Sequence, residues 1–223
     1  MVNELGLRES KKQQTRQLIS DCATRLFIER GFEQTTIADI ATAAGVAKKT
    51  VTNYFPRKED LALDHHEAFT QGLARTIADR APGEMPLAAL ARARRAALLE
   101  HSPVIGFTGP AFARMVADSP TLIARLRELH DQREEALAEA LATADPAQAS
   151  TPAQTSTTAQ ASTPAQAIAP RAAAALIAGA DRLLFRRIQE LTLAGRTHEE
   201  IEAALIPEAD HVDALLTAAL DAA

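Results

Sequence analysis

The stretch TTIADIATAAGVAKKTVTNYFPRKEDL, residues 35 to 61, contains three helix boundaries within 27 residues. Thr36 stands at the start of an apolar run and is followed three residues later by Asp39, which is the pattern of a capping box. Gly45 permits the backbone conformation of a tight turn. The spacing therefore predicts two short helices joined by a turn, a helix-turn-helix from Thr35 to Tyr54.

The second of these helices, expected from about residue 47 to 54, has two unlike faces. Val51 and Phe55 are spaced by four residues and would be buried together. Two adjacent cations at a helix N-terminus oppose the helix dipole, a cost that contact with anionic DNA would reverse. The cations and short polar groups of the outer face suit phosphates and base edges; they are Lys48, Lys49, Thr50, Thr52 and Asn53.

Charge is distributed unevenly along the chain. The net charge of −5 would ordinarily argue against binding to nucleic acid. Residues 1 to 60, however, carry a net charge of +2 and the remainder −7, and all five lysines lie within the first 58 residues. The N-terminal part is therefore the part that suits an anionic partner.

Helical periodicity recurs throughout the 223 residues, and no stretch alternates apolar and polar residues over the length of a strand. We therefore predict an all-α fold, with an N-terminal three-helix domain at residues 1–58 and a C-terminal helical bundle at 59–223. The first helix is expected at 10–30, and its apolar stripe includes Leu18, Ile19 and Phe27.

In the C-terminal domain, Pro207 is expected to interrupt the chain between a short helix and the last helix. Residues 145–170 are rich in Ala, Gln, Ser, Thr and Pro, and AQASTPAQ occurs there twice. This composition predicts a disordered linker. The other helices are expected at about 58–81, 87–101, 104–118, 121–143, 171–194 and from 208 onward.

Several classes of protein are disfavoured. The longest apolar run is too short for a membrane span, and the N-terminal stretch MVNELGLRESKKQ lacks the apolar core of a signal peptide, so a cytoplasmic protein without membrane contact is expected. Cys22 is the single cysteine and can form no internal disulfide. The chain has no HExxH motif, and its one ExxH runs from Glu208 to His211, so we predict no enzyme, cofactor or metal.

The first helix ends in Arg30-Gly31-Phe32, TTIADIATAAGV follows, the next helix closes in NYF, and PRKEDL comes after it. Over residues 11–62 this order resembles the DNA-binding domain of TetR-family transcriptional repressors. The resemblance implies a homodimer joined by its last two long helices, and hence a palindromic operator in double-stranded DNA. It also implies release of that operator by a small-molecule effector, through a shift of conformational population.

Carried over by position, the resemblance places Thr36, Lys48, Tyr54 and Lys58 on phosphates. It places Lys49, Thr50, Thr52 and Asn53 in the major groove. Ala47 stands where many members of the family have Ser or Thr, Lys49 where many have Gly, and Thr52 where many have Tyr. The base preference is therefore expected to be the chain's own.

The resemblance also places the effector pocket in residues 60 to 195. His65 and Phe69 are expected on the inward stripe of the helix at 58–81. Further candidate ligand-binding residues across the bundle are His101, Phe107, Phe112 and Met115.

Three alternatives compete with this interpretation. A metal-sensing repressor would use His65, His66 and His101 and would release its operator in response to metal. A helical-bundle metalloenzyme is the least favoured alternative. A protein that coats DNA without regard to sequence would require a more basic chain.

Overall fold

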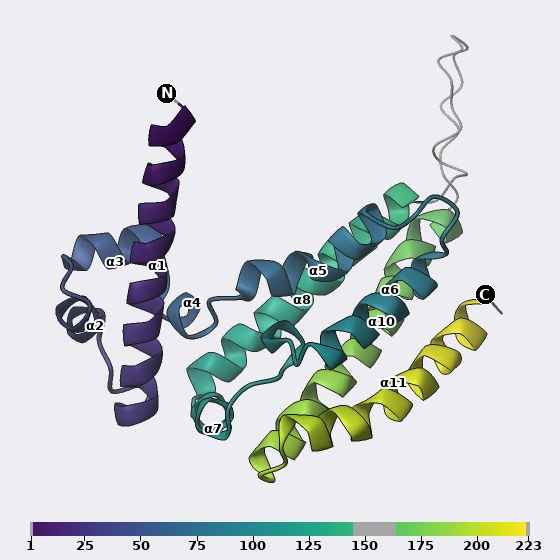
Figure 1. The fold of residues 1–223 in the computed structure, drawn as a ribbon. Coiled ribbons are helices and arrows are strands. Elements are labelled where there is room, and N and C mark those ends of the chain that lie inside the picture. Colours follow the sequence, from purple (N-terminus) through teal and green to yellow (C-terminus); the bar gives the residue numbers. More distant parts are fainter. Residues whose placement is uncertain (1, 145–163, 222–223) are drawn as a thin grey trace. The chain divides into compact units, whose positions relative to one another are not determined.

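A computed structural model describes residues 2–144 and 164–221, and every regular element in this part of the chain is helical (Figure 1), which confirms the all-α class. Within the same ranges, no helix is long and apolar enough to cross a membrane. The chain forms two compact units. The first unit comprises Met1–His66 and Gly109–Leu126, and the second comprises Glu67–Thr108 and Arg127–Ala223.

The first unit is built around one long helix. The helix α1 packs against α2 and α4, and α2 packs against α3. A later segment of the chain joins them, because α7 also packs against α1. The elements of this unit are α1 (Val2–Arg30), α2 (Ile37–Ala43), α3 (Lys48–Tyr54), α4 (Lys58–Ala62), α7 (Pro110–Asp118) and the start of α8 (Pro120–Ala144).

The core of the first unit draws on all of these helices. Ile19 and Phe27 of α1 are completely buried, and Met115 of α7 and Leu122 of α8 pack into the same cluster. The compact unit therefore extends beyond residue 58. The limit of the DNA-binding domain at residue 58 stays a prediction. Leu18 is 48% exposed, so its assignment to the buried stripe was wrong. The face of α1 that packs carries Ile19 and Phe27 and turns Leu18 outward.

The prediction of a single helix over residues 58–81 was also wrong. The chain forms α4 and then α5 (His66–Ala78), with a break at residues 63–65. Two side chains of α1 hold the break. Ser20 Oγ donates to Asp64 Oδ2 at 2.6 Å, and Arg16 Nη2 donates to the Asp64 carbonyl oxygen at 3.3 Å. The Asp64 carbonyl oxygen is thus satisfied by Arg16, and no backbone N–H of a continuing helix is needed to bind it.

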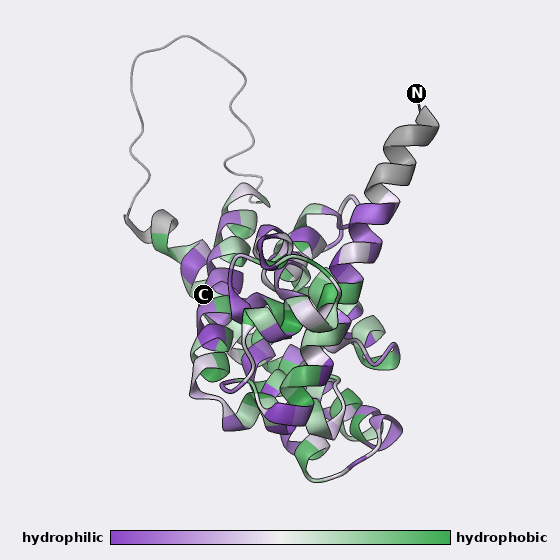
Figure 2. Ribbon diagram, turned by 90° about the vertical axis from the view of Figure 1, so that its left-hand side faces the viewer, coloured by the Kyte–Doolittle hydropathy of each residue, from purple (hydrophilic) through white to green (hydrophobic). Residues whose placement is uncertain are grey.

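The second unit is a bundle in which α11 packs against both α6 and α10 (Figure 1). Hydrophilic and hydrophobic residues are both found along the described helices of the chain, as Figure 2 shows by hydropathy. The predicted helix at 104–118 is instead a single 3-10 turn followed by α7, because the backbone at Gly106 is left-handed, with φ +114°. The elements of this unit are α5, α6 (Pro86–Leu99), the turn Pro103–Ile105, the rest of α8, α10 (Pro164–Leu193) and α11 (His198–Asp221).

Two predictions about helix ends are corrected. Residues 164–170 belong to α10, although they were assigned to the linker; the rest of that linker, residues 145–163, lies outside the described residues. Pro207 lies inside α11 and does not interrupt it. Pro207 is exposed, and Ile201 and Leu205 on the buried side of the helix are completely buried. Packing of that side keeps α11 continuous where one backbone hydrogen bond is missing.

The interior of the second unit contains charged side chains. Arg94 of α6 and Arg133 of α8 are 7% and 4% exposed. Arg133 donates to Asp181 Oδ2 of α10 at 2.6 Å and to the Phe69 carbonyl oxygen of α5 at 2.5 Å. Arg94 is paired with Asp213 of α11. The two arginines thus link α5, α6, α8, α10 and α11, and each buried charge has a partner of opposite sign.

A histidine lies beside this network. His130 is 7% exposed, and its ring meets those of Phe69 and Phe185 edge to face, with centroids 4.9 and 5.4 Å away. Burial, with the nearby charges of Arg182 and Arg133, lowers the pKa of His130 from 6.5 to about 4. The folded protein therefore holds this ring neutral at neutral pH.

A buried neutral histidine makes stability depend on pH. The unfolded chain takes up the proton near pH 6.5 and the folded protein only near pH 4, so stability is lost as the pH falls through that window. Between pH 7 and pH 5 the loss due to His130 is expected to be about 2 kcal/mol. Chemical denaturation of His130→Gln at both pH values should show a pH-dependent loss that is smaller by about this amount.

The matched control is His65→Gln, because the His65 side chain is 61% exposed. That variant should keep the wild-type difference between the two pH values. An equal difference for His130→Gln and the wild type would show that His130 is not held neutral.

Candidate nucleic-acid interface

The start of α2 has the capping box that the sequence predicts. The side-chain oxygen of Thr36 accepts a hydrogen bond from the Asp39 backbone N–H at 3.2 Å, and Asp39 Oδ2 accepts one from the Thr36 backbone N–H at 2.9 Å. Thr36 Oγ1 also donates to Asp39 Oδ2 at 2.6 Å. These hydrogen bonds to Thr36 lower the pKa of the Asp39 carboxyl below its ordinary 3.8. The beginning of α2 is thereby fixed.

The turn between α2 and α3 has the geometry that requires glycine. Gly45 has a φ of +65°, a backbone conformation that residues with a Cβ rarely adopt. The backbone N–H of Val46 donates back to the Ala41 carbonyl oxygen at 3.0 Å. This closes the turn and confirms the helix-turn-helix as the local structure.

One side of α3 is buried and the other carries polar groups. Val51 and Phe55 are 0% and 1% exposed, as predicted. Lys48, Lys49 and Asn53 are exposed, and Thr50 and Thr52 are half-buried. Thr52 Oγ1 donates to the Lys49 carbonyl oxygen at 3.1 Å, which leaves its lone pairs for another donor. Ala47, at the N-cap of α3, makes no side-chain cap, as expected of alanine.

Tyr54 and Lys58 lie at the edge of the candidate interface. Tyr54 is half-buried and packs against the core of the first unit. The Lys58 ammonium lies 4.2 Å from the centroid of the Phe32 ring. Burial lowers the pKa of Lys58, while the charges of Glu33 and Glu59 act in the opposite sense. Lys58 is therefore held in one place by its surroundings, unlike the exposed lysines of α3.

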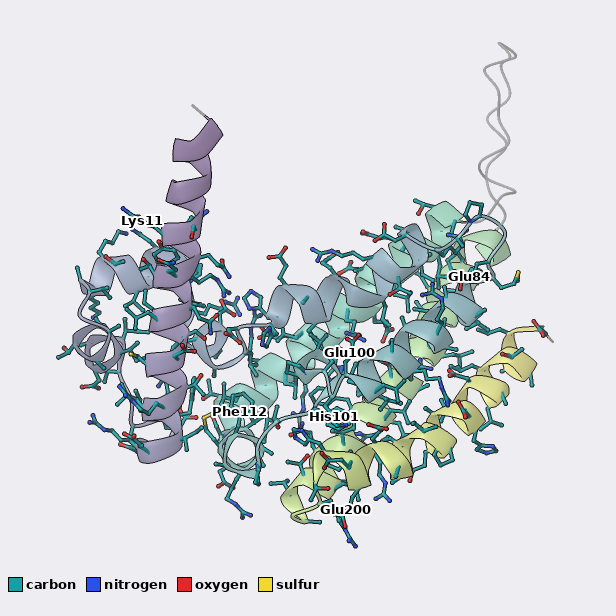
Figure 3. The ribbon with its side chains drawn as sticks, in the orientation of Figure 1. Lys11, Glu84, Glu100, His101, Phe112 and Glu200 are labelled. Atoms are coloured by element: carbon teal, nitrogen blue, oxygen red, sulfur yellow. The ribbon has the colours of Figure 1, made fainter. Side chains whose placement is uncertain are left out.

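The sequence did not identify Arg16 of α1 as a residue that supports this interface. The guanidinium of Arg16 lies over the Phe55 ring, 4.7 Å from its centroid, and also binds the Asp64 carbonyl oxygen. A basic residue on α1 carries no sign of this contact, because its partners lie some forty residues later in the chain. Lys11, on the turn of α1 before Arg16, is exposed (Figure 3).

The six predicted ligand-binding residues are divided between the two units. Phe112 and Met115 pack in the core of the first unit. His65 is exposed, so its assignment to an inward stripe was wrong; the break at 63–65 turns it outward. The residues of the second unit form two separate aromatic clusters, Phe69 with His130 and Phe185, and His101 with Phe107 and His198. A small cleft between α6 and α11 includes none of the six.

Nothing in the geometry favours the metal-sensing alternative. Among residues 10–144 and 168–221, no three His, Cys, Asp or Glu side chains lie close enough together to hold a metal ion. His101 Nε2 lies 2.7 Å from Glu202 Oε2, and His66 Nδ1 lies 3.0 Å from the Leu63 carbonyl oxygen. These histidines are engaged within the protein.

Known proteins are similar to this chain in sequence and in fold. Residues 19–64 match the family of bacterial regulatory proteins named tetR. The chain is 32% identical over 148 residues to the HTH-type transcriptional regulator TcmR of Streptomyces glaucescens, a match that spans 64% of this chain and 66% of TcmR.

Two solved structures share the fold over nearly their whole length. One is described as a TetR-family transcriptional regulator from Syntrophomonas wolfei (TM-score 0.56, 18% identity, 91% of this chain and 96% of that one). The other is GusR of Salmonella enterica (TM-score 0.53, 17% identity, 93% and 96%). The capped helix-turn-helix, the family match and the similarity to TcmR together define a transcriptional regulator. This chain belongs to the TetR family.

Removal of the cap should weaken α2 measurably. Thr36→Ala is expected to lower the free energy of unfolding by about 1 kcal/mol at pH 7, the usual cost of losing an N-cap. The pKa of Asp39 should rise, because its hydrogen bonds to the threonine hydroxyl are lost. In the wild type this stabilisation is present above the ordinary pKa of the carboxyl and disappears in acid, so the difference should shrink below pH 4.

Thr42→Ala is the control, because the Thr42 hydroxyl donates to the Ala38 carbonyl oxygen at 2.9 Å on the exposed side of the same helix. Denaturation should find it within about 0.5 kcal/mol of the wild type. Equal losses in the two variants would contradict a special role of the cap.

Proposed function

We propose that this chain is a homodimeric transcriptional repressor that binds a palindromic operator and releases it when a small molecule binds. The observation that carries the proposal is the polar face of α3. Lys48, Lys49 and Asn53 are exposed beside half-buried Thr50 and Thr52, on a helix whose opposite side is anchored by completely buried Val51. A rigid helix with cations and amide or hydroxyl groups on its outer face suits the major groove.

The contacts within this face divide into two kinds. We assign Thr36, Lys48, Tyr54 and Lys58 to phosphates, where they would position the helix without reading sequence. We assign Lys49, Thr50, Thr52 and Asn53 to base edges. Asn pairs well with adenine, and Thr tolerates several partners, including the thymine methyl group.

Exposed apolar side chains on the last two helices support self-association. Leu176 and Leu183 of α10 are 49% and 51% exposed, and Leu215 of α11 is 57% exposed. Leu176 and Leu183 are seven residues apart and so share one side of α10. Because such side chains gain stability when water is excluded, a second copy of the chain is the partner we propose.

The effector is assigned to the second unit, in keeping with the family. This unit holds the aromatic rings of Phe69, Phe107 and His101, three of the residues predicted from the sequence. We propose regulation in the cytoplasm by a shift between a DNA-binding state and a released state.

Selection of bound sequences from a random pool of double-stranded DNA tests the proposal, and a palindrome should emerge. Against the selected operator, Thr52→Ala and Lys49→Ala should change which bases are tolerated, because each base-specific interaction contributes about 1–3 kcal/mol of discrimination. Lys58→Ala should weaken all sequences alike and make the dependence on salt less steep. If Thr52→Ala leaves the base preference unchanged, α3 does not lie in the groove as proposed.

A charged residue introduced into the proposed dimer interface tests self-association. Leu183→Glu should give a monomer in analytical ultracentrifugation, because one glutamate per subunit would be buried without a partner. Binding to the palindrome should weaken in parallel. Leu99→Glu is the matched control, because Leu99 of α6 is 54% exposed but lies on another helix. If the Leu183→Glu protein remains dimeric, the interface does not include this side of α10.

A further inference from the structure

Ser119, directly before α8, and Arg125, in its second turn, hold the segments on either side of the helix-turn-helix at two points. One point is the α1–α2 connection, through Glu33. The other is α4, through Asp60. Both contacts lie within the first unit, and both join residues more than sixty positions apart in the chain.

The contact at α4 is a buried ion pair. Arg125 Nη2 and Nε donate to Asp60 Oδ1 at 2.9 and 3.2 Å, and the two residues are 9% and 6% exposed. Asp60 lies in the first turn of α4, two residues after Lys58. A buried carboxylate with such a partner has little freedom to move, because any displacement would leave both charges desolvated and unpaired.

The contact at the α1–α2 connection is a charged hydrogen bond. Ser119 Oγ donates to Glu33 Oε1 at 2.6 Å and accepts from the Leu122 backbone N–H at 3.2 Å. The hydrogen bond from Ser119, together with bonds from Thr121 and the charge of Lys58, holds the pKa of Glu33 below its ordinary value, although partial desolvation acts in the opposite sense. Glu33 is therefore a fixed negative charge near the Lys58 ammonium.

These contacts involve two residues close to Lys58, Glu33 and Asp60. Its ammonium lies over the ring of Phe32, which is 3% exposed. The neighbouring Glu33 is bound by Ser119, just before α8, and the helix that Lys58 begins is bound to Arg125. The segment that carries Phe32 and Glu33 and the helix that carries Lys58 are thus both held by residues at or beside the start of α8.

We propose that Arg125 is a positioning residue for DNA binding, which acts through Asp60 to hold the first turn of α4 and so place Lys58 on an operator phosphate. The inference rests on the proposed function. Arg125 is buried, and it is not assigned a contact with DNA.

A double-mutant cycle on the full-length protein tests the inference with the selected operator. Affinity and its salt dependence are measured for wild type, Arg125→Met, Lys58→Ala and the double variant. Each single change should weaken binding by about tenfold and reduce the salt slope by about 0.9 per subunit, the contribution of one phosphate contact. In the Lys58→Ala background, Arg125→Met should add less than about twofold, because the group it positions is already absent.

The control is Arg133→Met, which removes a buried arginine two turns further along α8, in the second unit. Its effect on affinity should be the same with and without Lys58, and the salt slope should not change. If Arg125→Met does not fold by circular dichroism, Asp60→Asn enters the same cycle. The neutral amide removes the ion pair with Arg125 at nearly unchanged size, and the same non-additive result is expected.

Additive losses for Arg125 and Lys58, or an unchanged salt slope in the Arg125 variant, would overturn the inference while the proposed function stands. A wild-type protein that selects no DNA sequence would overturn both.

Discussion

The burial of Val51 determines which side chains α3 presents outward. A helix turns 100° with each residue, so a seven-residue helix with Val51 completely buried has a single rotational setting. Phe55, one turn later, is buried against the same core and is covered by Arg16. The positions of the exposed lysines and of Asn53 follow from this packing. The outer face of α3 is thus a consequence of its inner face.

The two units use buried arginines in a similar way. In the first unit Arg125 pairs with Asp60, and in the second unit Arg133 pairs with Asp181. A buried ion pair adds little net stability compared with apolar residues of the same size, but loss of one partner is costly. Such pairs discriminate strongly against arrangements in which the partners are apart. The helices are consequently held in specific registers by a few directional contacts, in addition to apolar packing.

Local signals predicted the helix-turn-helix well. The capping pair Thr36 and Asp39, the turn at Gly45 and the spacing of Val51 and Phe55 all act within a few residues, so the sequence shows them directly. Contacts distant in sequence were not predictable. The break after α4 depends on Ser20, more than forty residues earlier, and the continuity of α11 through a proline depends on the helices that cover its buried side.

The candidate sites follow the same division. The polar face of α3 could be identified from the sequence because it lies on one short helix. The predicted effector residues come from several helices, and periodicity alone does not specify which of those helices meet. Phe112 and Met115 are apolar residues at helical spacing like the others, yet they belong to the core of the first unit. Nothing local distinguishes them.

The division of α8 between the two units has a consequence for exchanging modules between related regulators. A DNA-binding domain cut at residue 58 would leave behind Arg125, Ser119 and the side chains of α7 that complete its core. The part that can be transplanted is discontinuous, comprising residues 1–66 together with 109–126. A hybrid protein that takes both segments from the same parent keeps these contacts.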